Sequence, residues 1–115
     1  MTANPLLSSP KLNLLPPEVL PSGMQVFELQ LAPHGTPLAP FKASYFTVEP
    51  NGMSPIDSHS VHEIWMVAQG CGELTYDGRT CIIEPRQNFY FEPPKPHQVK
   101  NCGPEPLVIF SVWWK

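Results

Sequence analysis

Four side chains have the types and the spacing that could bind a divalent metal ion. Asp57, His59 and Glu63 lie close together in the stretch SPIDSHSVHEIW, and His97 follows a cluster of prolines in PPKPHQVKN. Successive side chains of an extended strand point to opposite faces, so Asp57, His59 and Glu63 are expected on one face, with His62 on the other. The pattern therefore predicts two carboxylates and two imidazoles directed into one interior.

The same strand faces carry residues that belong in a hydrophobic core, namely Trp65, Val67 and Val99. An unpaired charge buried among them would cost several kcal/mol. A divalent cation removes this cost, because two imidazole nitrogens and one or two carboxylate oxygens suit Zn²⁺, Fe²⁺ or Mn²⁺. Two histidines and one carboxylate also leave coordination positions open for substrate, water or dioxygen. A single His or Asp near a strand start is more often a turn or surface residue, so the spacing alone also allows a site without metal.

The composition excludes several classes of protein. The 115 residues include 16 prolines and 7 glycines, and helix interiors exclude proline, which rules out a helical bundle or a coiled coil. Hydrophobic residues make up 42% of the chain and charged residues only 15%, so it is not a charge-rich disordered protein. The length fits one domain with one core.

The charge of the chain indicates which partners to expect, and its N-terminal sequence indicates its location in the cell. The net charge is -3 and the seven cations are scattered singly, so nucleic acid is not an expected partner. No apolar stretch approaches the roughly 20 residues that span a bilayer, and the N-terminus has no basic signal region, so we expect no membrane association and a cytoplasmic location. The cysteines Cys71, Cys81 and Cys102 show no C-x-x-C spacing and cannot all pair, which fits a reducing compartment.

The prolines divide the chain into regions that can and cannot form paired strands. None lies between residues 56 and 84, whereas ten precede this window and six follow it. Residues 1–24 are predicted to be an extended, proline-rich arm that is either disordered or packed on the domain or on a neighbouring subunit. Residues 25–115 are predicted to form the β domain.

Apolar residues alternate in short runs bounded by turn residues, which is typical of strands. Asp77-Gly78 is a preferred two-residue hairpin turn and places Leu74 opposite Cys81, so no disulfide is expected between Cys71 and Cys81. The class is all-β, a sandwich or a barrel. Eight strands are predicted, at residues 25–31, 42–49, 61–68, 72–76, 79–83, 88–91, 97–101 and 107–114.

Two stretches of the sequence resemble the two motifs of the cupin superfamily. The resemblance covers roughly residues 42–114 and implies a small jelly-roll β-barrel. The first motif is matched by Gly52, Asp57, His59, Glu63 and Gly70, and the second by Pro93, His97 and Asn101.

Carried over from the family, the metal ligands would be His59, Glu63 and His97, with Asp57 where the first motif histidine stands. The resemblance thus implies one divalent transition metal, Zn²⁺, Fe²⁺ or Mn²⁺. Asp57 could ligate it, orient another ligand or act as a general base. The sequence also departs from the second motif, which lacks its opening glycine and has Lys95 in place of another glycine. Some cupins have lost the metal.

Aromatic residues near the expected barrel interior are candidates for a substrate pocket. Tyr45, Trp65, Tyr90 and Phe91 could line it, as could Trp113 on the final strand. For each of them taken singly, plain core packing is the commoner role. A barrel of this size has room for one small ligand.

The leading hypothesis is a small metal-dependent cupin enzyme of specialised metabolism that binds a polar metabolite through the metal. SPIDSHSVHEIW and the ending VIFSVWW also look similar to zinc cupins that act with methionyl-tRNA-synthetase-like domains to form nitrogen–nitrogen bonds, which implies a separate enzyme partner. The alternative is a non-catalytic module that senses or stores a ligand. The resemblance further implies a homodimer, since dimers are common in this family.

Overall fold

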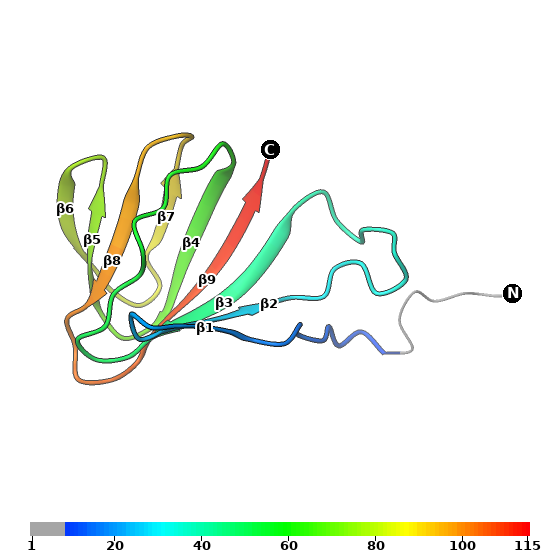
Figure 1. Cartoon of the computed structure of the whole chain (residues 1–115), viewed down its shortest axis with the longest axis horizontal. Coiled ribbons are helices and arrows are strands. Elements are labelled where there is room, and N and C mark those ends of the chain that lie inside the picture. The colour runs from blue at the N-terminus through cyan, green and yellow to red at the C-terminus, as the bar shows by residue number, and fades with distance from the viewer. Residues whose placement is uncertain (1–8) are drawn as a thin grey trace, which may run out of the picture.

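The computed structural model describes residues 9–115, and these residues form strands joined by turns and loops, without a helix (Figure 1). No helix that could cross a membrane therefore occurs in this part of the chain. The strands of the described residues are β1 (Glu18–Leu20), β2 (Met24–Glu28), β3 (Lys42–Val48), β4 (His62–Gln69), β5 (Gly72–Tyr76), β6 (Arg79–Ile83), β7 (Asn88–Phe91), β8 (His97–Asn101) and β9 (Leu107–Trp114).

The strands make two antiparallel sheets that face each other. The larger sheet has six strands in the order β1-β2-β3-β9-β4-β7, and the smaller has three in the order β6-β5-β8. Strands distant in sequence, such as β3 and β9, are therefore neighbours (Figure 1). This is the all-β jelly roll that the sequence predicts.

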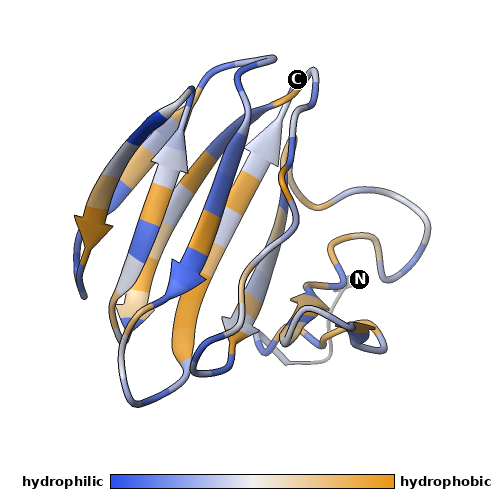
Figure 2. Cartoon of the chain, turned by 60° about the vertical axis from the view of Figure 1, so that its left-hand side comes forward, coloured by the Kyte–Doolittle hydropathy of each residue, from blue (hydrophilic) through white to orange (hydrophobic). Residues whose placement is uncertain are grey.

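Alternation along the strands places one face of each sheet in the core. Trp65 and Val67 of β4, Ile109 of β9 and Leu74 and Val99 of the smaller sheet are all at most 3% exposed. Figure 2 shows the corresponding alternation of hydrophobic and hydrophilic residues along the strands. Burying one such side chain contributes about 1.5–3 kcal/mol, so the contact between the two sheets holds the fold together.

The eight predicted strands correspond to β2–β9, with small differences at their ends. The largest difference is in β2, which ends at Glu28, after which Leu29 makes only an isolated bridge to Leu14. The turn prediction is confirmed, because Asp77 and Gly78 have φ angles of 49° and 81° and Leu74 pairs with Cys81.

One strand, β1, is not among the predicted ones. It lies inside the predicted arm and pairs with β2, with Leu20 opposite Met24. The turn between them contains Gly23, whose φ of 88° favours glycine. Prolines flank β1 on both sides. Because they lie outside this three-residue edge strand, their missing N–H groups remove no hydrogen bond between β1 and β2. The described part of the arm thus lies along the sheet, while the division at residues 24 and 25 stays a prediction.

Asn101, at the end of β8, connects the end of β3 to the loop after β8 from a buried position. Its side-chain nitrogen donates hydrogen bonds to the backbone oxygens of Val48 and Glu105, both at 2.8 Å. Its side-chain oxygen accepts one from the backbone nitrogen of Gly103, also at 2.8 Å. The side chain is 1% exposed, so water cannot replace these bonds.

Replacing Asn101 by Ala is expected to lower the free energy of unfolding by about 2–4 kcal/mol, because buried backbone groups would lose their partners. Denaturant unfolding of the purified variant measures this loss. The matched control is Asn88→Ala, at an exposed position of β7, which should change stability by about 0.5 kcal/mol or less. Equal losses in the two variants would contradict the role assigned to Asn101.

Candidate metal centre

The structure brings His59, Glu63 and His97 together at one end of the barrel. Glu63 lies near the start of β4, His97 is the first residue of β8, and His59 lies in the loop before β4. The Oε1 atom of Glu63 is 3.0 Å from Nε2 of His59 and 3.0 Å from Nε2 of His97. Potential ligand atoms of the three residues all lie within 4.8 Å of one another.

The second carboxylate oxygen of Glu63 is held by two donors. Nε1 of Trp65 donates to Oε2 at 2.9 Å, and the Ser111 hydroxyl donates a short hydrogen bond to the same oxygen. Trp65 and Ser111 face each other across the β4–β9 pair. Because both donors engage Oε2, the carboxylate is oriented with Oε1 directed at the two imidazoles.

The ring of His97 is fixed by aromatic neighbours. It stacks on Phe91, with ring centroids 4.4 Å apart and planes 6° apart, and meets Trp65 edge-on at 5.3 Å. The residue is 2% exposed. Neither ring nitrogen makes a hydrogen bond, since the approach of Nε2 to Glu63 is close but not directed as a hydrogen bond. A buried imidazole with both nitrogens unsatisfied is typical of a ring that needs a further partner.

The hydrogen bond of His59 to the backbone indicates which of its ring nitrogens is free to bind a metal ion. Its Nδ1 lies 3.2 Å from the backbone oxygen of Val61, which only accepts, so Nδ1 carries the hydrogen. In the neutral ring, Nε2 then directs a lone pair at Oε1 of Glu63. Two imidazole nitrogens and one carboxylate oxygen converge in this way, and a metal cation placed among them would satisfy all three. The donor set suits Zn²⁺, Fe²⁺ or Mn²⁺.

Glu63 remains ionised over the physiological pH range. Burial alone would raise its pKa, but the contacts with His97, Ser111 and Trp65 outweigh burial and lower the pKa from 4.5 to about 2. The carboxylate is therefore available as a negatively charged ligand for a metal ion.

Asp57 does not join this group of potential ligands. Its side chain is exposed, and its contact with the site runs through the backbone, where Asp57 and His97 exchange hydrogen bonds of 3.0 and 2.9 Å. The alternation of faces that grouped Asp57 with His59 and Glu63 applies only within a strand, and residues 58–61 are loop. The expectation that Asp57 shares one strand face with the other three is therefore wrong.

The aromatic residues predicted for the pocket divide between the two faces of the large sheet. Trp65 and Phe91 are 2% exposed and enclose His97. Tyr45 and Tyr90 are 43% and 50% exposed and lie on the outer face, where Tyr90 hydrogen-bonds His62. They do not line the barrel interior, because they alternate with the buried positions of β3 and β7. His62 points outward as expected.

Ser111 is the functional residue that the sequence analysis missed. Its signal was present, because Ser111 is a polar residue in an otherwise apolar run and shares the parity of the buried Leu107 and Ile109. A hydroxyl at such a position needs a buried partner, and Glu63 is that partner.

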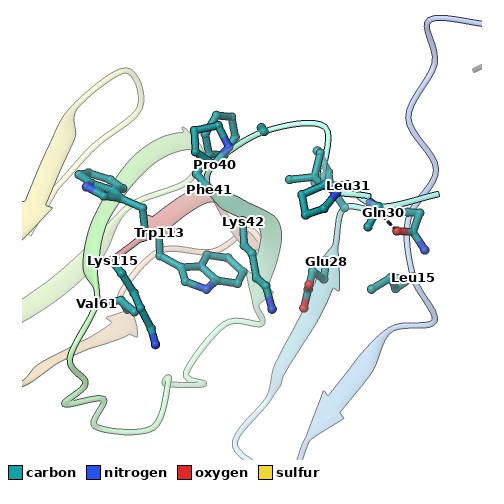
Figure 3. A pocket seen from close by; sticks show the side chains of 15 residues that line it. Leu15, Glu28, Gln30, Leu31, Pro40, Phe41, Lys42, Val61, Trp113 and Lys115 are labelled. Atoms are coloured by element: carbon teal, nitrogen blue, oxygen red, sulfur yellow. Dashed lines mark hydrogen bonds between the residues drawn. The ribbon is translucent and has the colours of Figure 1, made fainter. Parts of the chain in front are cut away.

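A groove of about 700 Å³ lies on the part of the chain shown in Figure 3. His59, Glu63 and His97 do not line it, but two of its lining residues neighbour them, since Trp113 is paired with Glu63 across β4 and β9 and the backbone of Val61 contacts His59. Segment 28–32, segment 37–42 and Leu15 form much of its wall. Glu28 brings one negative charge, and Lys42 and Lys115 bring two positive charges, to walls that are otherwise largely apolar.

The low pKa of Glu63 predicts a pH dependence of the metal-free protein. A carboxylate whose pKa is lowered by folding stabilises the fold above about pH 4.5, and this contribution is lost as the pH falls to about 2. Between about pH 4.5 and pH 2, the free energy of unfolding of Glu63→Gln should therefore fall by up to about 3 kcal/mol less than that of the wild type. Denaturant unfolding at a series of pH values measures the difference, with Glu73→Gln at an exposed position of β5 as control. Equal pH profiles for all three proteins would contradict the prediction.

The sequence and fold of this chain are similar to those of known proteins. The cupin domain family matches residues 44–113. A conserved barrel domain protein from Salinispora arenicola is 30% identical, with a TM-score of 0.72 over 100% of this chain and 89% of that chain. The polyketide cyclase RemF from Streptomyces resistomycificus is 21% identical, with a TM-score of 0.72 over 85% of this chain and 72% of that one.

Part of the chain also matches a curated relative in sequence. The alginate biosynthesis protein AlgA of Pseudomonas aeruginosa is 29% identical over 73 residues, or 63% of this chain. The chain spans only 15% of the length of that protein. The matched cupin domain contains all three members of the ligand group, and the chain belongs to the cupin family.

Proposed function

We propose that this protein is a metal-dependent cupin enzyme that binds a small polar metabolite at a divalent ion held by His59, Glu63 and His97. The observation that carries the proposal is the convergence of two Nε2 atoms on one carboxylate oxygen. A divalent ion bound there would act as a Lewis acid on an oxygen or nitrogen of the substrate. Three protein ligands would leave it positions for the substrate.

The residues around the ligands keep them in place before anything binds. Phe91 and Trp65 fix the ring of His97, and Ser111 and Trp65 fix the carboxylate of Glu63. Most of these side chains lie on paired strands, which hold geometry better than loops. Only His59 comes from a loop, and its Nδ1 contact with Val61 sets both its ring orientation and its tautomer.

The groove supports a substrate with an apolar part and at least one polar or charged group. Trp113, paired with Glu63 across β4 and β9, supplies an aromatic surface to the groove, and Lys42 and Glu28 supply charges that can orient a polar group (Figure 3). Asp57, exposed and paired with His97 through the backbone, is our candidate for a proton acceptor at the same end of the barrel. The polyketide cyclase RemF has this fold, so a barrel of this kind can support an enzyme.

Metal analysis of the purified protein tests the proposal. After dialysis against Zn²⁺, Fe²⁺ or Mn²⁺, we expect about one ion per chain by mass spectrometry of the elements. Glu63→Gln and His97→Ala should lose it, because each removes one of three ligands. His62→Ala is the matched control, since His62 contacts Tyr90 on the outer face. Full metal content in both ligand variants would refute the site.

Ser111→Ala tests whether the support of Glu63 matters for the metal. Loss of one hydrogen bond to Oε2 should lower metal affinity by about 10–100-fold. Competition with a fluorescent chelator measures the affinity. Ser44→Ala is the control, because Ser44 is a buried serine opposite Ser111 in the β3–β9 pair. Equal affinities in the two variants would show that Ser111 has no positioning role.

An assay for consumption of a substrate distinguishes the proposed enzyme from a non-catalytic module that only binds its ligand. Metal-loaded and metal-free protein are incubated with a panel of small metabolites under air, and the mixtures are analysed by mass spectrometry. We expect consumption of at least one compound by the loaded form alone. A compound that stabilises the protein but is recovered unchanged would favour the binding module instead. Nitrogen–nitrogen bond formation with a synthetase-like partner stays a prediction.

A further inference from the structure

Cys71 and Cys102 form a close pair at the end of the barrel away from the ligand group. Their Sγ atoms are 3.6 Å apart, although the residues lie far apart in the sequence. The antiparallel register of β5 and β8 pairs Gly72 with Asn101, and one step further places Cys71 opposite Cys102. The backbone nitrogen of Cys102 donates to the oxygen of Cys71 at 3.4 Å, which extends the pairing to the cysteines.

The local structure leaves room and access for chemistry between the two sulfurs. A Cβ atom on Gly103 would lie 3.0 Å from Sγ of Cys71, so glycine at this position leaves space for the thiol. Cys102 is exposed and Cys71 is half-buried, and all three cysteines are free. Cys81 lies elsewhere, on β6 opposite Leu74. Facing positions on antiparallel strands are within the range that a disulfide spans.

Metal binding explains the pair less well than redox chemistry. A stable site for a thiophilic metal ion takes about four ligands, whereas among residues 9–115 the one ligand group of three or more is His59, Glu63 and His97. The contact with Cys102, then burial, and then the charges of Glu84 and Glu105 raise the pKa of the Cys71 thiol. Cys71 is therefore a thiol at neutral pH.

We propose that Cys71 and Cys102 form a reversible intramolecular disulfide, with a low-molecular-weight disulfide as oxidant. The exposed Cys102, as its thiolate, attacks the small disulfide, forms a mixed disulfide and releases one small thiol. Cys71 then attacks the sulfur of Cys102, loses its proton and releases the second small thiol. Two protein thiols are thus oxidised and one small disulfide is reduced to two thiols.

The bond would close a loop that contains β5, β6, β7 and β8. Such a loop restricts the unfolded chain, so oxidation is expected to stabilise the protein. His97 lies at the other end of β8, about 16 Å away along the strand. The disulfide would therefore lock one end of the barrel and leave the ligand group intact. This inference does not depend on the proposed enzyme activity.

Controlled oxidation of the full chain tests the proposal. The protein is equilibrated with mixtures of reduced and oxidised glutathione, alkylated and digested, and its peptides are mapped by mass spectrometry. We expect a Cys71–Cys102 linked peptide, an alkylated Cys81, and reversal by reduced glutathione. The melting temperature should rise by about 10 °C on oxidation, with unchanged metal content.

Single cysteine variants distinguish a Cys71–Cys102 disulfide from other products of oxidation. Cys81→Ser should keep the linkage and the rise in melting temperature, whereas Cys71→Ser and Cys102→Ser should lose both. A linkage that involves Cys81, a disulfide between two chains, or persistent mixed disulfides on Cys102 would overturn the proposal. Mapping of wild type and Cys81→Ser decides the question even if the other variants fail to fold.

Discussion

The structure depends on one buried negative charge, the carboxylate of Glu63. A carboxylate in an apolar interior is strongly destabilising without partners, and its partners here come from several strands. Trp65 on β4 and Ser111 on β9 hold one oxygen, while His97 on β8 and His59 approach the other. These contacts link the large sheet to the small one at the point where the barrel opens. The same arrangement that makes the charge tolerable also makes a ligand set for a cation.

Much of this arrangement could be predicted from the sequence, because strand structure follows simple periodicities. The proline-free window and the alternating runs located β2–β9, and parity placed Glu63, Trp65 and His97 inside. Asp57 does not join them, because the alternation of side chains between two faces holds only within a strand and residues 58–61 form a loop. Tyr45 and Tyr90 were misplaced because an aromatic residue suits either face of a sheet. The strand β1 has three residues between prolines and leaves almost no periodic signal.

The two ends of strand β8 have different roles. Its first residue, His97, belongs to the ligand group, and its last, Asn101, hydrogen-bonds three backbone groups. Cys102 follows directly and meets Cys71. The strand is thus anchored at one end by uncharged hydrogen bonds, which are insensitive to pH and metal. This anchoring keeps His97 in register with β5 whatever occupies the ligand group.

The groove beside the ligand group has walls of two different origins. Trp113 belongs to a strand that also supports Glu63, whereas residues 37–41 and Leu15 belong to segments outside the paired core. Connecting segments tolerate changes of length and sequence far better than strands do. Changes in these connecting segments would therefore reshape the groove without disturbing His59, Glu63 and His97, since the groove wall and the ligand group are encoded in separate parts of the chain.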